Sequence, residues 1–184
     1  MGKYISTKVF DGFSCVFRQW KAETTHCKYL HGYGVSFKLW FEGELDDRNW
    51  VWDFGGMKRA KGKIDDMSPK DWFDYMFDHT FVVAEDDPFK ESFLKMNEAG
   101  VAQVRIVPAT GAERFAQFIY DKLNPFISDE TEGRVKISSP FDGDGVFDAA
   151  SDLASGAAKD AQSFGYSTTL DTFKKSSDLD DQRQ

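Results

Sequence analysis

Regular alternation of apolar and polar side chains over residues 35–41 constrains the fold more than any other feature of the sequence. Val, Phe, Leu and Phe alternate there with Ser, Lys and Trp, which is the period of a strand with one buried face. Residues 4–17 are rich in aromatic and β-branched types, and Gly12 indicates a bulge or bend. We therefore expect two antiparallel strands joined by the long connection 18–30.

Shorter apolar patterns predict two more strands. Ala102, Val104 and Ile106 alternate in a segment that ends at Pro108, and residues 135–137 repeat the pattern. These four strands are expected to form a mainly antiparallel sheet.

Two helical regions are predicted between the strands. The first covers about 55–77 and is interrupted at Ser68-Pro69. The second begins after Thr110, which forms a capping-box pattern with Glu113, and stops at Asn124-Pro125. The predicted fold class is therefore α+β, a four-stranded antiparallel sheet with helices on one face.

The composition changes near residue 141. Residues 142–184 hold nine Asp against four basic residues, a net −5 of the total −8, and are rich in Gly, Ala and Ser. Such a segment buries little apolar surface. We expect one domain over residues 1–141 and an acidic tail over 142–184 that is disordered or docks on a partner.

The acidic balance and the cysteine count exclude several classes of protein. A net charge of −8 is unlike the basic face of a general nucleic-acid binder. Two cysteines are too few for a disulfide framework, and no apolar stretch approaches the length of a membrane span. The start of the chain has no apolar region of a signal peptide, so we expect a cytoplasmic protein.

Three short stretches contain residues capable of chemistry, at 27–33, 51–54 and 78–79. Each is weak alone. A single Cys is more often a core residue than a nucleophile, and a lone His more often a hydrogen-bonding group than a ligand. Asp53, placed before a helix, is most simply an N-cap.

The order and spacing of these stretches resemble the 6-pyruvoyl/6-carboxytetrahydropterin synthase family over residues 5–139. The positions that match its motifs are Cys27, Leu30, His31, Gly32, Val51, Asp53, Phe54, Asp78, His79 and Glu113. The resemblance implies a tunnelling fold that assembles as trimers stacked into hexamers, with active sites between subunits.

The resemblance also implies a reaction. In the family a zinc ion held by three His polarises a substrate oxygen. Carried over, Cys27 is the general base, and Asp78 orients His79 as its acid partner. Thr110 and Glu113 correspond to the substrate-binding motif. The expected activity is a lyase acting on dihydroneopterin triphosphate, making 6-carboxytetrahydropterin for deazapurine (queuosine-type) synthesis.

Two of the three zinc-ligand positions differ from the family pattern. Phe17 and Tyr33 occupy them, so His31 is the one metal-ligand candidate that remains. A rearranged site from Cys15, His26 and His31 is an alternative.

The Glu that anchors the pterin on the family's last strand is also missing. Ser138 and Ser139 stand in its place, and a serine makes one hydrogen bond where the carboxylate makes two.

These departures keep a second hypothesis open, a catalytically inactive family member reused as an oligomeric scaffold whose tail contacts a protein. Under either hypothesis the expected partners are a pterin-like small molecule and further copies of the chain, in a trimer or hexamer. Nucleic acid and membrane are not expected.

Overall fold

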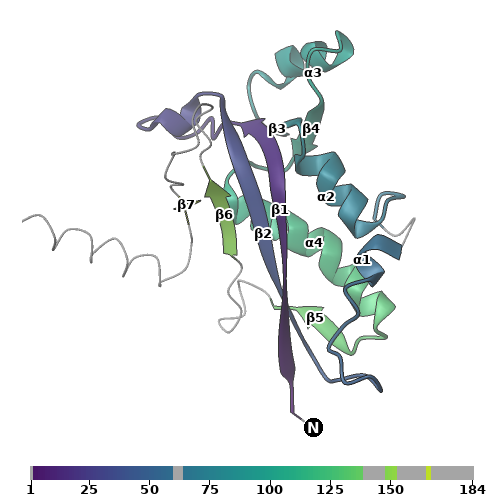
Figure 1. Ribbon diagram of the computed structural model, residues 1–184. Helices are drawn as coiled ribbons and strands as arrows, with labels where there is room; N and C mark the ends of the chain where they lie inside the picture. The colour runs from purple at the N-terminus through teal and green to yellow at the C-terminus, as the bar shows by residue number, and fades with distance from the viewer. Residues whose placement is uncertain (1, 60–63, 139–147, 153–164, 167–184) are drawn as a thin grey trace, which may run out of the picture.

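The structure is a computed structural model that describes residues 2–59, 64–138, 148–152 and 165–166 (Figure 1). Its elements are β1 (Tyr4–Phe17), η1 (His26–Lys28), β2 (His31–Gly43), α1 (Gly56–Arg59), α2 (Pro69–Phe77), β3 (Thr80–Ala84), α3 (Lys90–Glu98), β4 (Val104–Val107), α4 (Ala112–Glu130), β5 (Val135–Ile137), β6 (Asp148–Asp152) and β7 (Gly165–Tyr166). The predicted domain boundary at 141 and most of the predicted tail lie outside the described residues.

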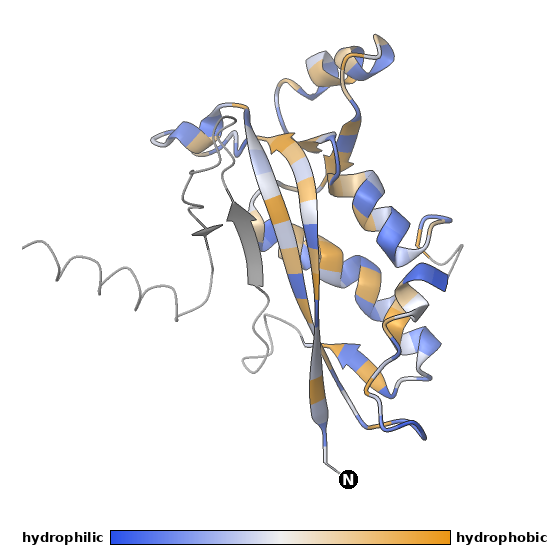
Figure 2. Ribbon diagram, in the orientation of Figure 1, coloured by the Kyte–Doolittle hydropathy of each residue, from blue (hydrophilic) through white to orange (hydrophobic). Residues whose placement is uncertain are grey.

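The long hairpin of β1 and β2 is the framework of the molecule. The strands pair antiparallel from Tyr4 opposite Gly43 to Phe17 opposite His31, as predicted. The register shifts between Phe10 and Phe13, around Gly12 with φ +84°, which confirms the predicted bulge. Figure 2 shows apolar residues recurring along both strands.

The sheet is mixed: most of its strand pairings are antiparallel, as predicted, but the prediction of four strands that are all antiparallel is wrong. β3 pairs parallel with β1, and β4 pairs parallel with β3. β5 and β6 pair antiparallel with β2, and β7 with β6. β3 was missed because all five of its residues are buried, and such a strand shows no alternation.

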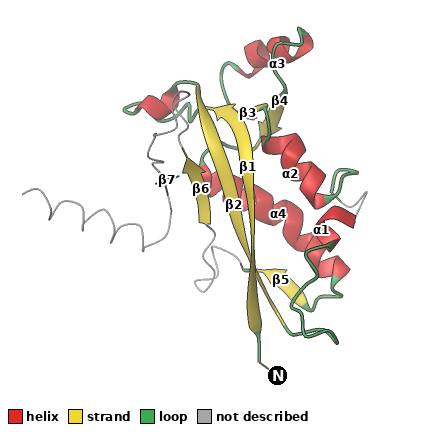
Figure 3. Ribbon diagram, viewed as in Figure 1, coloured by secondary structure: helices red, strands yellow, loops and turns green. Residues whose placement is uncertain are grey.

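Helices α2 and α4 cover one face of the hairpin and form the main core with it (Figure 3). α2 begins as predicted at Ser68-Pro69, where the Ser68 side chain accepts a hydrogen bond from the N–H of Asp71. Its aromatic residues pack against the strands, as in the stack of Phe73 on Phe10 with ring centroids 4.5 Å apart. This part of the layer prediction is confirmed.

Helix α3 was not predicted, and it lies on the other face of the sheet. Val82 belongs to the main core, whereas its neighbours Phe81 and Val83 pack in a second cluster with Phe93 and Leu94 of α3. Since successive strand residues face opposite sides, α3 covers the face of β3 and β4 that α2 and α4 do not. The sequence gives no clear helical period of apolar residues for α3, because none of its residues is fully buried.

Both predicted ends of the last helix are wrong. Thr110 does not cap α4; its hydroxyl donates to the carbonyl of Arg18, and Gly111 occupies the N-cap without a side-chain bond. The helix also continues through Pro125 to Glu130, because Phe126 and Ile127 are buried in the core. No helix within the described residues has the length and apolar character to cross a membrane.

Candidate functional site

The three positions that correspond to the zinc ligands of the resembled family lie at one end of the hairpin, where β1 ends and β2 begins. Phe17 and His31 are direct partners across the strands, and Tyr33 pairs with Cys15 two residues further along. Paired and alternate residues of a hairpin point to the same face. The side chains at positions 17, 31 and 33 therefore converge, as the resemblance implied.

Aromatic rings fill the space between these strands. Phe17 and Tyr33 stack with centroids 3.8 Å apart, and the His31 ring lies tilted against Tyr33 with centroids 4.4 Å apart. Phe115 of α4 meets Phe17 edge-on at 5.0 Å. We call these four residues the aromatic stack. Phe17 and Tyr33 are buried within it, and His31 is its half-buried outer ring.

The predicted base Cys27 lies in η1, beside the same end of the hairpin. Its carbonyl accepts the N–H of Gln19 at 2.8 Å, and its thiol is free and half-buried. The Gln19 side chain in turn lies against Gly111, where φ is +119° and a Cβ would stand 2.2 Å from Nε2. The positive φ favours glycine at this position, and the contact with Gln19 joins the Cys27 segment to the start of α4.

The predicted substrate-binding residues reach the same end from α4. Thr110 is held by its hydrogen bond to the carbonyl of Arg18, directly after Phe17. Glu113 stands exposed in the first turn of the helix. Both side chains therefore come from a segment that is fixed to the end of β1.

Asp78 and His79 lie on the opposite edge of β1. The Asp78 carboxylate accepts the N–H of Ser14 at 3.3 Å, and the N–H of His79 donates to the Ser14 carbonyl at 2.7 Å. The two side chains form an ion pair, with His79 Nδ1 3.0 Å from Asp78 Oδ1. No hydrogen bond in the described part of the chain joins this couple to Cys27.

His79 is exposed and its backbone is unusual. Its side chain is 79% exposed and its φ is +54°, a left-handed conformation that non-glycine residues rarely adopt. Sparse backbone conformations of this kind cluster at functional sites. The couple is thus held by β1 but directed to the surface.

The residues present do not fit the family's zinc ion. Phenylalanine has no donor atom, and rings stacked 3.8 Å apart leave no room for an ion between them. The described residues contain no group of three His, Cys, Asp or Glu arranged to hold a metal, which includes the alternative from Cys15, His26 and His31. Cys15 is 2% exposed, and burial raises the pKa of its thiol to about 12, far from a metal-binding thiolate.

The region of the family's pterin-anchoring carboxylate also differs. Ser138 is buried, and its N–H donates to the carbonyl of Trp40. Ser139 lies outside the described residues. Ser138, which directly follows β5, thus offers a buried serine where the family has a carboxylate.

A buried ion pair that the sequence analysis missed holds this end of the molecule together. The Arg18 guanidinium makes two hydrogen bonds to Asp87, of 2.6 and 2.8 Å, and lies over the rings of Phe89 and Phe93. The Arg18 and Asp87 side chains are 18% and 2% exposed. Sixty-nine residues separate the two, so no local pattern could have revealed the pair.

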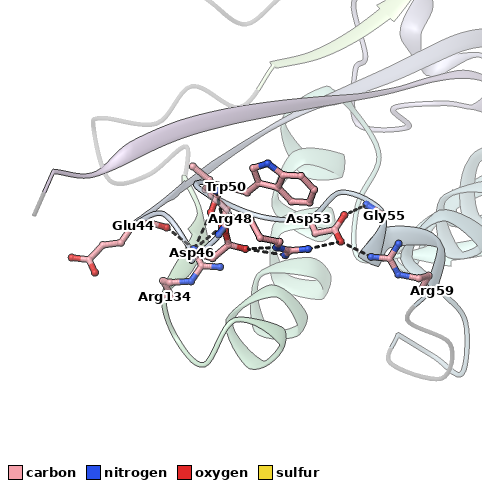
Figure 4. A network of polar contacts seen from close by, with 9 residues as sticks. Glu44, Asp46, Arg48, Trp50, Asp53, Gly55, Arg59 and Arg134 are labelled. Atoms are coloured by element: carbon pink, nitrogen blue, oxygen red, sulfur yellow. Dashed lines mark hydrogen bonds and ion pairs between the residues drawn. The ribbon is translucent and has the colours of Figure 1, made fainter.

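The far end of the hairpin has a hollow of about 540 Å³, lined by residues that include the aromatic side chains of Tyr4, Trp50 and Trp52. Polar contacts run along its rim (Figure 4). Asp53 accepts the N–H of Gly55 and pairs with Arg48 and Arg59. Asp53 therefore holds the turn before α1 rather than capping the helix as its N-cap residue.

Comparison with known proteins agrees with this architecture. The family model described as 6-pyruvoyl tetrahydropterin synthase matches residues 6–139. An uncharacterized protein, WS1659 from Wolinella succinogenes, is similar at 18% identity with a TM-score of 0.62, covering 85% of this chain and 96% of that one. The 6-pyruvoyl tetrahydropterin synthase of Plasmodium vivax is similar at 12% identity and TM-score 0.51, covering 91% and 99%. No curated protein matches the sequence.

The fold is thus an α+β fold of the tetrahydropterin synthase type. The chain belongs to the 6-pyruvoyl tetrahydropterin synthase family.

Proposed function

We propose that this chain is a lyase of the 6-carboxytetrahydropterin synthase type that acts on dihydroneopterin triphosphate, in deazapurine (queuosine-type) synthesis. The observation that carries the proposal is the Asp78–His79 couple, with 3.0 Å between its polar atoms and an imidazole that is 79% exposed. Exposed ion pairs contribute little to stability. An acid–base role gives this strained and exposed pair a function that stability does not.

In the proposed reaction Cys27 and His79 move protons. The Cys27 thiolate takes a proton from the substrate carbon beside the pterin ring, and His79, held by Asp78, returns one to the substrate. One proton leaves and one is returned, so these two steps need no outside oxidant. Thr110 and Glu113 orient the heterocycle from the start of α4.

The positions of the two groups support a site shared between subunits. Asp78 and His79 contact β1 at Ser14, on the edge away from β2, whereas Cys27 contacts Gln19 beyond the end of the strand. A neighbouring copy that presents its own Asp78–His79 couple to Cys27 would complete the set. We therefore propose a homo-oligomer, a trimer or hexamer, with a pterin as its ligand.

Subunit mixing tests both parts of this proposal. Purified chain is expected to consume dihydroneopterin triphosphate, and Cys27→Ser and His79→Gln each to abolish turnover. Co-refolding the two variants in equal amounts should restore about a quarter of the activity, since about one interface in four then unites an intact Cys27 with an intact His79. Cys15→Ala is the matched cysteine control and should stay active.

Two results would count against the proposal. Absence of both turnover and pterin binding in the unmodified chain would end the lyase assignment. If the unmodified chain turns the substrate over but the mixture of variants recovers no activity, the lyase assignment stands and the proposal of a site shared between subunits is wrong.

The aromatic stack at the zinc-ligand positions favours a second candidate, an inactive family member that serves as an oligomeric scaffold and contacts a protein through its tail. β6 pairs with β2, so deleting all of 142–184 would also remove a strand of the sheet. Deleting 167–184 is the cleaner test. The scaffold proposal expects partner binding to be lost while the oligomer size stays the same, and unchanged partner binding would contradict it.

A further inference from the structure

The backbone around the aromatic stack brings positions 17, 31 and 33 together on one face of the hairpin, but only position 31 carries a histidine. Positions 17 and 31 are opposite each other, and position 33 follows on the same face of β2. Three imidazoles at these positions would converge on one point. The side chains alone therefore decide whether a metal fits.

Opening the aromatic stack for an ion is unfavourable. Phe17 and Tyr33 are 3% and 7% exposed and stack at 12° between ring planes. An ion there would have to separate the rings and would gain no donor from Phe17. Phe115 also packs edge-on against Phe17, with ring centroids 5.0 Å apart. A zinc ion is thus excluded by shape as well as by donor chemistry.

The remaining histidine has a defined tautomer. His31 Nδ1 lies 2.8 Å from the carbonyl oxygen of Tyr29. A carbonyl only accepts hydrogen bonds, so Nδ1 carries the proton and the neutral ring has its lone pair on Nε2. Within the described residues no side chain or backbone group is hydrogen-bonded to Nε2. His31 is also the outer, half-buried ring of the stack.

We propose that the aromatic stack closes the family's zinc position in this chain, and that His31 acts there without a metal, offering the Nε2 lone pair to an N–H or O–H group of a planar heterocyclic ligand. This inference does not rest on the proposed lyase reaction. It holds equally for a pterin-binding protein that turns nothing over.

Zinc titration of four proteins tests the closed metal position. The unmodified chain and Tyr33→Phe, which keeps the stack, are expected to retain less than about 0.1 equivalent of zinc after dialysis against micromolar zinc chloride. The double variant Phe17→His with Tyr33→His should retain about one equivalent, because it restores three converging imidazoles. Adding His31→Ala to the double variant should remove that zinc again.

Three outcomes would overturn the proposal. Stoichiometric zinc in the unmodified chain contradicts it directly, and zinc that disappears in Tyr33→Phe would make Tyr33 the ligand. A double variant that folds, as judged by its thermal unfolding and oligomer size, yet binds no zinc would show that the stack is not what excludes the metal.

NMR signals of the His31 ring nitrogens test the proposed role of Nε2. This test uses the unmodified chain, so it does not depend on whether a variant folds. We expect the unmodified chain to show the Nδ1–H tautomer, with the Nε2 signal unchanged by zinc chloride and shifted by a reduced pterin such as dihydroneopterin. An Nε2–H tautomer, a shift with zinc alone, or no shift with a saturating pterin would each contradict the role given to His31.

Discussion

The two ends of the β1–β2 hairpin are both rich in aromatic rings, but their polar groups are used differently. At the far end, Asp53 forms ion pairs with both Arg48 and Arg59, as Figure 4 shows. Arg134 of the same region donates to the carbonyls of Glu44 and Val51. These charged groups are committed to contacts that hold loops together.

At the site end, several polar groups have no partner among the described residues. The Cys27 thiol is free, and His31 Nε2 accepts no hydrogen bond. His79 pairs with Asp78 but is largely exposed. Chemistry needs groups that are available to a ligand, so a hollow with aromatic walls is a weaker indication of a site than a smaller surface with uncommitted donors and acceptors.

The largest expected effect comes from disrupting the Arg18–Asp87 ion pair, which supports the site end of the hairpin. Asp87→Ala leaves Arg18 without its partner in a nearly buried position, and we expect a loss of about 3–5 kcal/mol in the free energy of unfolding. Asp86→Ala, which breaks the exposed pair with Lys21, is the control and should cost under about 1 kcal/mol. Urea unfolding measures both changes in the free energy of unfolding. Equal losses in the two variants would contradict the expectation that burial makes the Arg18–Asp87 pair the more important one.

The contrast between the two cysteines sharpens the description of the site end. Burial raises the pKa of Cys15 to about 12, so hardly any thiolate forms at pH 8, whereas Cys27 is half-buried. Iodoacetamide should therefore label Cys27 at least about a hundredfold faster than Cys15 in the native protein. Peptide mass analysis over time reads both rates, and urea should abolish the difference.

Arg134 tests whether the polar groups of the far end are structural. Arg134→Ala removes the donor of hydrogen bonds to the Glu44 and Val51 carbonyls, with an expected loss of about 1–3 kcal/mol and no effect on ligand binding at the site end. Arg59→Ala, whose side chain is 67% exposed, should cost at most about 1 kcal/mol. A loss of pterin binding in Arg134→Ala would contradict the separation of the two ends.

The smallest expected effect is the pH dependence contributed by Asp53. The N–H of Gly55 and the guanidinium of Arg59 hold the pKa of this carboxyl below its usual value of 3.8. Because the folded-state pKa is the lower one, the stabilisation is present above pH 3.8 and is lost as the pH falls through the folded-state value. Asp53→Asn should therefore lower the melting temperature at pH 7, and the gap from the unmodified chain should narrow below pH 3.8. Asp47→Asn, at an exposed position of the same loop, is the control.

Much of the fold could be predicted where the signal is local. Alternation marked β2, Gly12 marked the bulge, and Ser68-Pro69 marked the start of α2, because each depends on residues close in sequence. β3 and α3 were missed for the opposite reason. The first is buried on both sides and the second has no fully buried residue, so neither shows a clear period of buried and exposed side chains.

The candidate site was predictable in its residues but not in its arrangement. The order of Cys27, His31 and Asp78-His79 indicated the family from the sequence, and the loss of donors at positions 17 and 33 could be seen there too. Nothing local showed that Thr110 would bond to Arg18 instead of capping α4. The placement of the Asp78–His79 couple on the other edge of β1 likewise depends on a contact across 64 residues.

The sequence by itself thus determined the strand hairpin, the family and the candidate site residues, since these follow from residue type and spacing. Only the tertiary structure decided that Phe17 and Tyr33 stack on each other, that Arg18 pairs with the buried Asp87, and that Asp78 bonds to the edge of β1 at Ser14. Those outcomes depend on which distant segments pack together, and packing is decided by the free energy of the whole core rather than by any local stretch.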